Sequence, residues 1–322
     1  MQPEIRRFRQ GPRENPAEQS AEERPEEQLL GQFIPLHYHF NMLQDTDRVS
    51  AFREAIVSSV REGFRVVELG GGTGILSYFA ARQGAEVVCV ERNPDLVRAA
   101  RRFLENNLSR VEFERVSVIH ADAFNYTPDQ PVDVVICEML HTAMLREKQL
   151  EMIHSFKQRY IAAVGEPLPE FIPAASRLFV QPVEQSFDFF DYHAPVPMFQ
   201  PAATSNDRTK PLAEPVLYSM IGYDGPIPLS FSWDSDVKID HSGRFNALRF
   251  LTQNFLAFDV AQQRAIPWSN QFLVLPVEHA LDVAPGQHLR VQFQYEAGQS
   301  LETLQQSIRC AVAMRPDARK SA

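Results

Sequence analysis

The sequence has few cysteines and no long apolar run, and both shortages limit its class. Its 322 residues include three cysteines, Cys89, Cys137 and Cys310, each within an apolar stretch. A small, odd number of buried thiols is typical of a reducing compartment, so we expect a cytoplasmic protein. The sequence contains neither CxxC nor HExxH, and we expect no metal site. No run approaches the roughly 18 apolar residues of a membrane helix, and residues 1–27 lack the apolar core of a secretory signal.

The chain also has fewer basic than acidic residues. The chain has 32 Lys and Arg against 41 Asp and Glu, a formal net charge of −9. Non-specific nucleic-acid binding requires a basic surface, so we expect no nucleic-acid partner. An acidic chain suits a cationic substrate instead.

Composition divides the chain into four stretches. Residues 1–28 are rich in Glu, Arg, Gln and Pro, and they predict a disordered charged tail. Residues 29–173 alternate short apolar runs with helical spacing, which predicts an α/β domain with a Rossmann-like parallel sheet. In residues 174–316 the helical spacing fades, and β runs predict an antiparallel β sandwich or β-barrel. Residues 317–322 are predicted to be a second tail.

A glycine-rich segment follows the first predicted strand. It places an acid and three alternating glycines at Glu68, Gly70, Gly72 and Gly74. A dinucleotide-binding loop requires GxGxxG, and the segment has no third glycine at that spacing from either possible start. The observed spacing resembles the first motif of class I S-adenosylmethionine (SAM) methyltransferases, which implies that these four residues contribute to a SAM site.

Two acids follow the next two predicted strands. Glu91 ends the second strand, where a carboxylate can accept hydrogen bonds from ribose hydroxyls. Asp122 follows the third strand, where an acid in this fold commonly meets the adenine amino group. Either acid alone could equally be a surface carboxylate at a strand end. Together with the glycine segment and in this order, they predict SAM as the cofactor.

Two glutamates follow the fourth predicted strand. Glu138 stands at the strand end, and Glu147 follows nine residues later after an apolar stretch. A loop of that length can fold back so that both carboxylates face one pocket, although ordinary solvated loop positions remain the alternative. The Asn/Asp-Pro-Pro-aromatic signature of enzymes that methylate amide or nucleobase nitrogens does not occur at this point.

The two glutamates resemble the double-glutamate loop of the protein arginine methyltransferase family, at the family's own spacing. Residues 68–81 are similar to the family's glycine segment, and residues 268–287 are similar to part of its C-terminal barrel. The resemblance therefore covers nearly the whole chain past the tail. It implies a homodimer, in which an arm of the barrel contacts a second subunit.

Residues 39–48 reproduce the family's pattern His-x-x-Met-Leu-x-Asp-x-x-Arg. By resemblance, His39 lies beside the cofactor and Met42 packs against both substrate and SAM. Arg48 is implied to bind the SAM carboxylate, which suits the bidentate geometry of a guanidinium group.

The implied activity is SAM-dependent N-methylation of a guanidino group, with arginine in a protein or peptide as the acceptor. A guanidinium group has a pKa above about 12 and enters the site as a cation. By orienting it, Glu138 and Glu147 would draw positive charge toward the far nitrogens and leave lone-pair density on the target nitrogen. The alternatives are methylation of a small molecule such as free arginine, and a SAM-binding partner module without catalysis. A nicotinamide oxidoreductase is disfavoured because the GxGxxG pattern fails.

Departures from the family pattern leave the acceptor and the degree of methylation open. Ile266-Pro267-Trp268 replaces the family's Thr-His-Trp, so the histidine that would pair with Asp45 is missing. His141 and His279 are candidates to replace it, although a structural role is the commoner one for a histidine. Two further departures are Phe33, where the family has a Tyr, and Met139-Leu140, where it has an aromatic pair.

Overall fold

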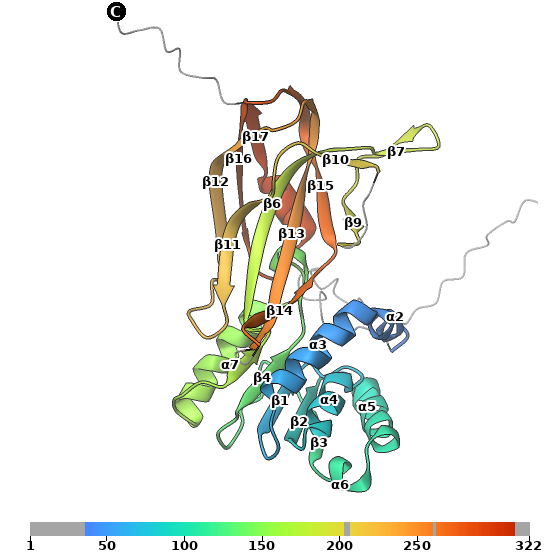
Figure 1. Ribbon diagram of the computed structural model, residues 1–322, viewed down its shortest axis with the longest axis vertical. Coiled ribbons are helices and arrows are strands. Elements are labelled where there is room, and N and C mark those ends of the chain that lie inside the picture. Colours follow the sequence, from blue (N-terminus) through green and yellow to red (C-terminus); the bar gives the residue numbers. More distant parts are fainter. Residues whose placement is uncertain (1–35, 203–206, 260–261, 313–322) are drawn as a thin grey trace, which may run out of the picture.

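The computed structural model describes residues 36–202, 207–259 and 262–312. The predicted tails at 1–28 and 317–322, and Phe33, lie outside the described residues. Two parts follow one another along the long axis of the molecule, an α/β domain and an antiparallel β domain (Figure 1). None of the described helices is long and apolar enough to cross a membrane.

The α/β domain contains a five-stranded parallel sheet in the order β3-β2-β1-β4-β5. The strands β1 and β4 are buried along nearly their whole length, as expected for a parallel sheet covered on both faces. Because the strand order reverses between β1 and β4, the carboxyl ends of these two strands form a switch point where ligands bind in open α/β sheets. The strands are β1 (Arg65–Leu69), β2 (Glu86–Glu91), β3 (Val116–His120), β4 (Val134–Cys137) and β5 (Glu170–Ile172).

Local signals set the helix boundaries. The helix α5 begins at Pro94, and the Asn93 side chain caps it by accepting a 2.9 Å hydrogen bond from the backbone N–H of Asp95. A capping box between Ser109 and Glu112 starts the short helix α6. The helices are α2 (His39–Gln44), α3 (Thr46–Ser59), α4 (Ile75–Arg82), α5 (Pro94–Asn107), α6 (Arg110–Phe113), η1 (Thr142–Met144), α7 (Gln149–Ala163) and α8 (Leu301–Ser307).

The β domain consists of two antiparallel sheets around an aromatic core. The larger has seven strands, in the order β10-β6-β13-β15-β9, with β11 paired to β6 and β14 paired to β13. The smaller has the order β12-β16-β17. Phe250 of the larger sheet packs edge-on against Phe293 of the smaller, with ring centroids 5.4 Å apart. The predicted antiparallel β fold is confirmed, with its strands divided between these two sheets.

The strands of the larger sheet are β6 (Ala175–Gln185), β9 (Met198–Gln200), β10 (Thr209–Pro211), β11 (Val216–Gly222), β13 (Gly243–Asp259), β14 (Arg264–Ser269) and β15 (Phe272–Val283). Those of the smaller sheet are β12 (Ser230–Lys238), β16 (His288–Glu296) and β17 (Arg309–Val312). Two short strands, β7 (Asp188–Phe189) and β8 (Tyr192–His193), pair only with each other.

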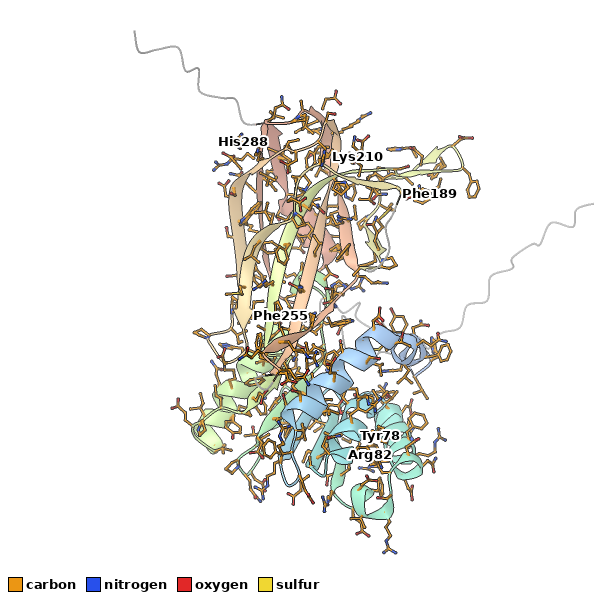
Figure 2. All side chains as sticks on the ribbon, in the orientation of Figure 1. Tyr78, Arg82, Phe189, Lys210, Phe255 and His288 are labelled. Atoms are coloured by element: carbon orange, nitrogen blue, oxygen red, sulfur yellow. The ribbon has the colours of Figure 1, made fainter. Side chains whose placement is uncertain are left out.

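The β7–β8 hairpin projects from the side of the β domain, as the position of Phe189 in Figure 2 shows. Phe187 at its base is buried, whereas Phe190 and Tyr192 at its tip are exposed. The proline-rich stretch after the hairpin contributes two strands to the larger sheet, because β9 pairs with β15 and β10 pairs with β6.

The two domains meet where α3 packs against β13 and β14. Phe52 of α3 lies edge-on to Trp268 of β14, with ring centroids 6.1 Å apart. Phe255, labelled in Figure 2, lies on β13 at the same junction. Trp268 is therefore an interface anchor, and the contact fixes the β domain beside the carboxyl ends of the parallel strands.

Candidate active site

A cavity of about 360 Å³ lies at the carboxyl ends of the parallel strands. Every loop that follows one of β1 to β4 contributes to its wall, together with α2 and the start of α7. The residues that line it are His39, Met42, Gly70, Gly72, Val90, Glu91, Arg92, Asn93, Leu96, Asp122, Ala123, Phe124, Glu138, Met139, Glu147, Lys148 and Met152. Eight of the eleven predicted site residues are in this set; Arg48, Glu68 and Gly74 are not.

The glycine segment forms a tight turn under the cavity. Gly72 has a φ of +55°, and a Cβ atom there would lie 2.9 Å from the imidazole of His39. Gly71 faces the opposite way, where a Cβ atom would lie 2.1 Å from the sulfur of Cys89. The backbone of this turn thus fits between His39 on the cavity side and the buried thiol of Cys89 on the sheet side. A residue with a side chain at Gly71 or Gly72 would displace the turn.

Glu91 ties the end of β2 to the glycine turn. One carboxylate oxygen accepts a 2.8 Å hydrogen bond from the N–H of Gly72, and the other accepts a 2.7 Å bond from the N–H of Asn93. Asp122 lies on the neighbouring strand end, where it accepts a 3.0 Å bond from the N–H of Phe124. Backbone N–H groups therefore hold both carboxylates in fixed positions at the cavity wall, and the remaining oxygen lone pairs are available to a ligand.

Glu68 lies beneath the glycine turn instead of lining the cavity. Its buried carboxylate accepts hydrogen bonds from the backbone N–H, at 2.9 Å, and from the hydroxyl of Ser77. Burial raises the pKa of Glu68 to about 7. In this arrangement Glu68 connects β1 to the first turn of α4 and supports the turn that Gly70, Gly72 and Gly74 form. Gly74 itself sits at the N-cap of α4, against Leu104 of α5.

The helices α2 and α3 close the cavity from the N-terminal side. His39 and Met42 of α2 line it, and His39 is buried. Arg48 of α3 forms an ion pair with Glu138, and it also donates a 3.1 Å hydrogen bond to the carbonyl of Met42. The sequence did not predict this ion pair, which connects the N-terminal helices directly to the first of the two glutamates.

Glu138 and Glu147 face the same cavity, as the loop length suggested. Burial, followed by the charge of Glu138, raises the pKa of Glu147 to about 8. Arg48 opposes this shift in part, because its positive charge favours the ionised carboxylate. Two carboxylates close together in a partly desolvated site attract a cation strongly. The cation compensates the negative charge that water no longer solvates.

The two candidate replacements for the missing histidine lie elsewhere. His141 contacts Phe199 edge-on with ring centroids 5.4 Å apart, and burial lowers its pKa to about 4. The side chain of His279 is largely exposed on β15, beside Glu278. Asp45, the residue that such a histidine would pair with, caps α3 by accepting a 3.0 Å hydrogen bond from the N–H of Arg48. His141 and His279 both have structural surroundings that account for them.

Sequence reasoning missed several residues of the cavity wall. Phe124 and Met152 supply apolar surface, and Lys148 follows the second glutamate directly. Gln149 lies behind the wall, where it donates a 2.8 Å bond to the carbonyl of Cys137 and accepts a 2.9 Å bond from the N–H of Met139. Helical spacing from Gln149 to Met152 could have placed both on one face of α7, but no local pattern predicts that this face turns toward the cavity.

Among the described residues, no group of three or more His, Cys, Asp or Glu side chains is arranged to hold a metal ion. The donors at the cavity are instead suited to an organic ligand with hydroxyl, amino and cationic groups. Carboxylates stand at three strand ends, and the apolar surfaces of Leu96, Phe124 and Met139 lie between them.

Comparison with known proteins also indicates a methyltransferase. Residues 66–159 match the model of the methyltransferase domain family. A Methanothermobacter thermautotrophicus protein, named only as an uncharacterized protein, is 29% identical over 272 residues, which are 84% of this chain and 97% of that protein. The probable protein arginine N-methyltransferase 6 of Arabidopsis thaliana is 32% identical over 148 residues, but these cover only 45% of this chain and 32% of that protein.

A solved structure supports the fold over a longer stretch. The Trypanosoma brucei PRMT1 enzyme–prozyme heterotetrameric complex with AdoHcy superimposes with a TM-score of 0.64 at 15% identity, covering 85% of this chain and 96% of that one. Fold and site together define a class I SAM-dependent methyltransferase. Within that class, the chain is related to the protein arginine methyltransferases.

Proposed function

We propose that this methyltransferase transfers the methyl group of SAM to a nitrogen of a guanidino group, most simply that of arginine in a protein or peptide. The observation that carries the proposal is the pair of glutamates, Glu138 and Glu147, facing one cavity beside the strand ends. Among the common cationic side chains, only a guanidinium group is planar and presents its N–H groups in a fork that fits two carboxylates.

The cavity residues suit SAM in detail. The carboxylate of Glu91 would accept from the ribose hydroxyls and that of Asp122 from the adenine amino group, while Leu96 and Phe124 offer apolar surface. The glycine turn would allow close approach of the backbone, and His39, Met42 and Arg48 would close the site from α2 and α3. Bound SAM supplies an electrophilic methyl group on a sulfonium sulfur, so the chain's own residues must orient the acceptor and remove one proton.

Glu147 is the proposed proton acceptor. With a pKa of about 8, it is mostly protonated at neutral pH in the free site, and an incoming guanidinium favours its ionised form. When the N–CH₃ bond forms and the S–CH₃ bond breaks, the acceptor nitrogen carries an excess proton, which Glu147 takes up and later releases to water. Glu138, paired with Arg48, holds the guanidinium in position. Positioning and electrostatics supply most of the rate.

Label transfer from methyl-labelled SAM tests the proposal. The acceptors are an arginine-rich peptide pool and, separately, free arginine and other small guanidines. We expect label in the peptide, and reduced but measurable transfer in Glu147→Gln with SAM affinity, measured by calorimetry, largely retained. Glutamine keeps the shape of the side chain and removes only its charge and basicity, so it separates chemistry from packing.

Each other result changes the conclusion in a definite way. Label only in small guanidines would make the protein a metabolite methyltransferase with the same acceptor pocket. SAM binding without transfer to any acceptor would indicate a SAM-binding partner module. Full transfer in Glu147→Gln would reject the role of the glutamate pair.

We also propose a division of labour and a homodimer. Residues 29–173 would hold SAM, and residues 174–316 would position the acceptor and contact a second copy. The support for a dimer is the projecting hairpin with its exposed Phe190 and Tyr192, together with exposed apolar side chains on and near α2 such as Phe40. Sedimentation analysis of Phe190→Ser against the wild type tests this contact. The fully buried thiols of Cys89 and Cys137 are consistent with a cytoplasmic location.

A further inference from the structure

The backbone between the two glutamates is held in an unfavourable conformation. In residues 138–147, which we call the double-glutamate loop, Ala143, Met144 and Arg146 have φ values of +58°, +57° and +60°. Residues with a side chain rarely adopt this left-handed region, because Cβ crowds the backbone there. Three such residues within four positions persist only where surrounding contacts determine the conformation.

The β domain supplies those contacts. The hydroxyl of Thr252 accepts a 2.8 Å hydrogen bond from the N–H of Ala143, and the side-chain amide of Asn270 donates a 3.0 Å bond to the carbonyl of Leu140. The turn after β16 adds two backbone bonds of 2.8 Å, from the N–H of Gly298 to Met144 and from the N–H of Arg146 to Gln299. The loop is thus fastened along its length by residues more than 100 positions away in the sequence.

Behind these contacts lies a chain of buried polar groups. Asn254 donates a 2.9 Å bond to Asn270 and accepts a 2.7 Å bond from the hydroxyl of Ser176, which also contacts the hydroxyl of Tyr223 at 3.2 Å. Thr252, Asn254 and Ser176 are at most 1% exposed. Burying polar groups is costly unless their hydrogen bonds are made, so the network fixes the orientation of Asn270 at its end.

We propose that Thr252 and Asn270 are positioning residues that hold Glu138 and Glu147 in the geometry required to bind the acceptor. The inference rests on the proposed function of the two glutamates. Thr252 acts on the strained half of the loop that leads to Glu147, and Asn270 acts on the half that begins at Glu138. The β domain thereby shapes the acceptor site through its contacts with the double-glutamate loop.

The test compares two matched losses of a buried hydroxyl. Thr252→Val keeps the shape of the side chain but leaves the Ala143 N–H without its acceptor, whereas Thr252→Ser keeps the hydroxyl. The control is Thr209→Val at the far end of the β domain, where the hydroxyl of Thr209 is also buried between two glutamines, Gln185 and Gln200. All three variants should bind SAM as the wild type does.

We expect Thr252→Val to lower kcat/KM for the guanidine acceptor by about 5-fold to 100-fold, the range set by one buried, unsatisfied donor. The pH midpoint of kcat/KM should move as well, because the spacing of the two carboxylates changes. Thr252→Ser and Thr209→Val should stay close to the wild type in both respects. If Thr252→Val and Thr209→Val lost kcat/KM equally, the loss would result from general destabilisation, and the proposal would be overturned.

Amide hydrogen exchange provides a readout that does not depend on the proposed reaction. Peptides that cover 138–147 should exchange about tenfold faster in Thr252→Val than in Thr209→Val, since one retained hydrogen bond protects the loop amides. Asn270→Leu gives a second, independent disturbance if Thr252→Val does not fold. A wild type that methylates no guanidine would reject the proposed function, whereas unchanged loop exchange in both Thr252→Val and Asn270→Leu would reject the positioning role.

Discussion

The cofactor side and the acceptor side of the cavity are built in different ways. On the cofactor side, Glu91 binds the N–H groups of Gly72 and Asn93, and all three residues belong to adjacent strand ends of one sheet. On the acceptor side, the double-glutamate loop receives its hydrogen bonds from Thr252 and Asn270 in another domain. The first side is therefore specified by short-range sequence, and the second depends on how the two domains pack.

This difference predicts that changes on the two sides separate cofactor binding from acceptor chemistry. On the acceptor side, strained backbone and two close carboxylates are stabilised only by the surrounding structure. On the cofactor side, each carboxylate has a backbone partner, and a glutamine in place of Glu91 keeps an oxygen for one of its two backbone N–H donors. We expect the changes below to separate the two sides, and they are ordered from the largest effect to the smallest.

The largest effect is expected for Glu138→Gln on the acceptor side. Removing this charge weakens the hold on the guanidinium during transfer, and we expect the rate to fall by about 10²-fold to 10³-fold, as for loss of one preorganised electrostatic contact. Glutamine still offers an oxygen to Arg48, so SAM affinity should change by less than about fivefold, or 1 kcal/mol. Single-turnover transfer and calorimetry measure the two quantities. A parallel loss of both would place Glu138 on the cofactor side.

The pH dependence of kcat/KM should show the state of Glu147. Its carboxyl is neutral below its pKa of about 8, and a neutral carboxyl holds a guanidinium weakly. Since the guanidinium stays charged throughout, kcat/KM should rise about tenfold per pH unit up to pH 8 and then level off. In Glu147→Gln the rise should disappear. A profile with its midpoint near pH 6.5 that survives in Glu147→Gln would point to a histidine instead.

The same shift has the opposite sign for stability. Because the pKa of Glu147 is higher in the folded protein than the ordinary value of 4.5, the folded state keeps its proton when the unfolded state has lost it. The contribution of this group to the free energy of unfolding therefore falls as pH rises from about 4.5 to 8. Activity and stability should thus change in opposite directions across that interval.

A smaller and separate effect is expected for Glu91→Gln on the cofactor side. The substitution removes the charge that would bind the ribose hydroxyls, and hydrogen bonds to a charged group contribute about 1.5–3 kcal/mol. We expect SAM affinity to fall by about 10-fold to 100-fold, with the transfer rate at saturating SAM close to that of the wild type. Calorimetry and transfer at high SAM concentration test this. A loss of rate that high SAM does not restore would contradict the separation of the two sides.

The sequence predicted the cofactor side well, because its signals are local. Strand, glycine turn and strand-end acid follow one another within 24 residues, from Glu68 to Glu91, and hydrophobic patterning alone places them at one edge of the sheet. It did not distinguish Glu68, which supports the turn from below, from the residues that line the cavity. Glu68 and the glycines that line the cavity belong to one sequence motif. Only the hydrogen bonds of Ser77 to Glu68 show that this carboxylate lies below the turn.

The acceptor side was predictable only in its two glutamates. Their spacing suggested a shared pocket, but the ion pair of Arg48 with Glu138 joins residues 90 positions apart. Thr252 and Asn270 contact the loop from the β domain. The sequence predicts the strands of that domain, but it does not predict where they pack against the loop. A threonine within a β strand, such as Thr252, and an asparagine between two strands, such as Asn270, carry no local signal for such a role.

The smallest effect is expected at Asp45, between the two sides. In the related family this position has a histidine partner that could carry the proton away, whereas here Asp45 caps α3 through the N–H of Arg48. Asparagine caps a helix about as well as aspartate, so Asp45→Asn should keep kcat/KM within about twofold and leave stability nearly unchanged. Asp45→Ala should lower the free energy of unfolding by about 1 kcal/mol through loss of the cap alone. Thermal unfolding measures the change in stability, and the pH profile of Asp45→Asn measures the change in activity. A tenfold loss of activity in that variant would make Asp45, and not Glu147, the proton acceptor.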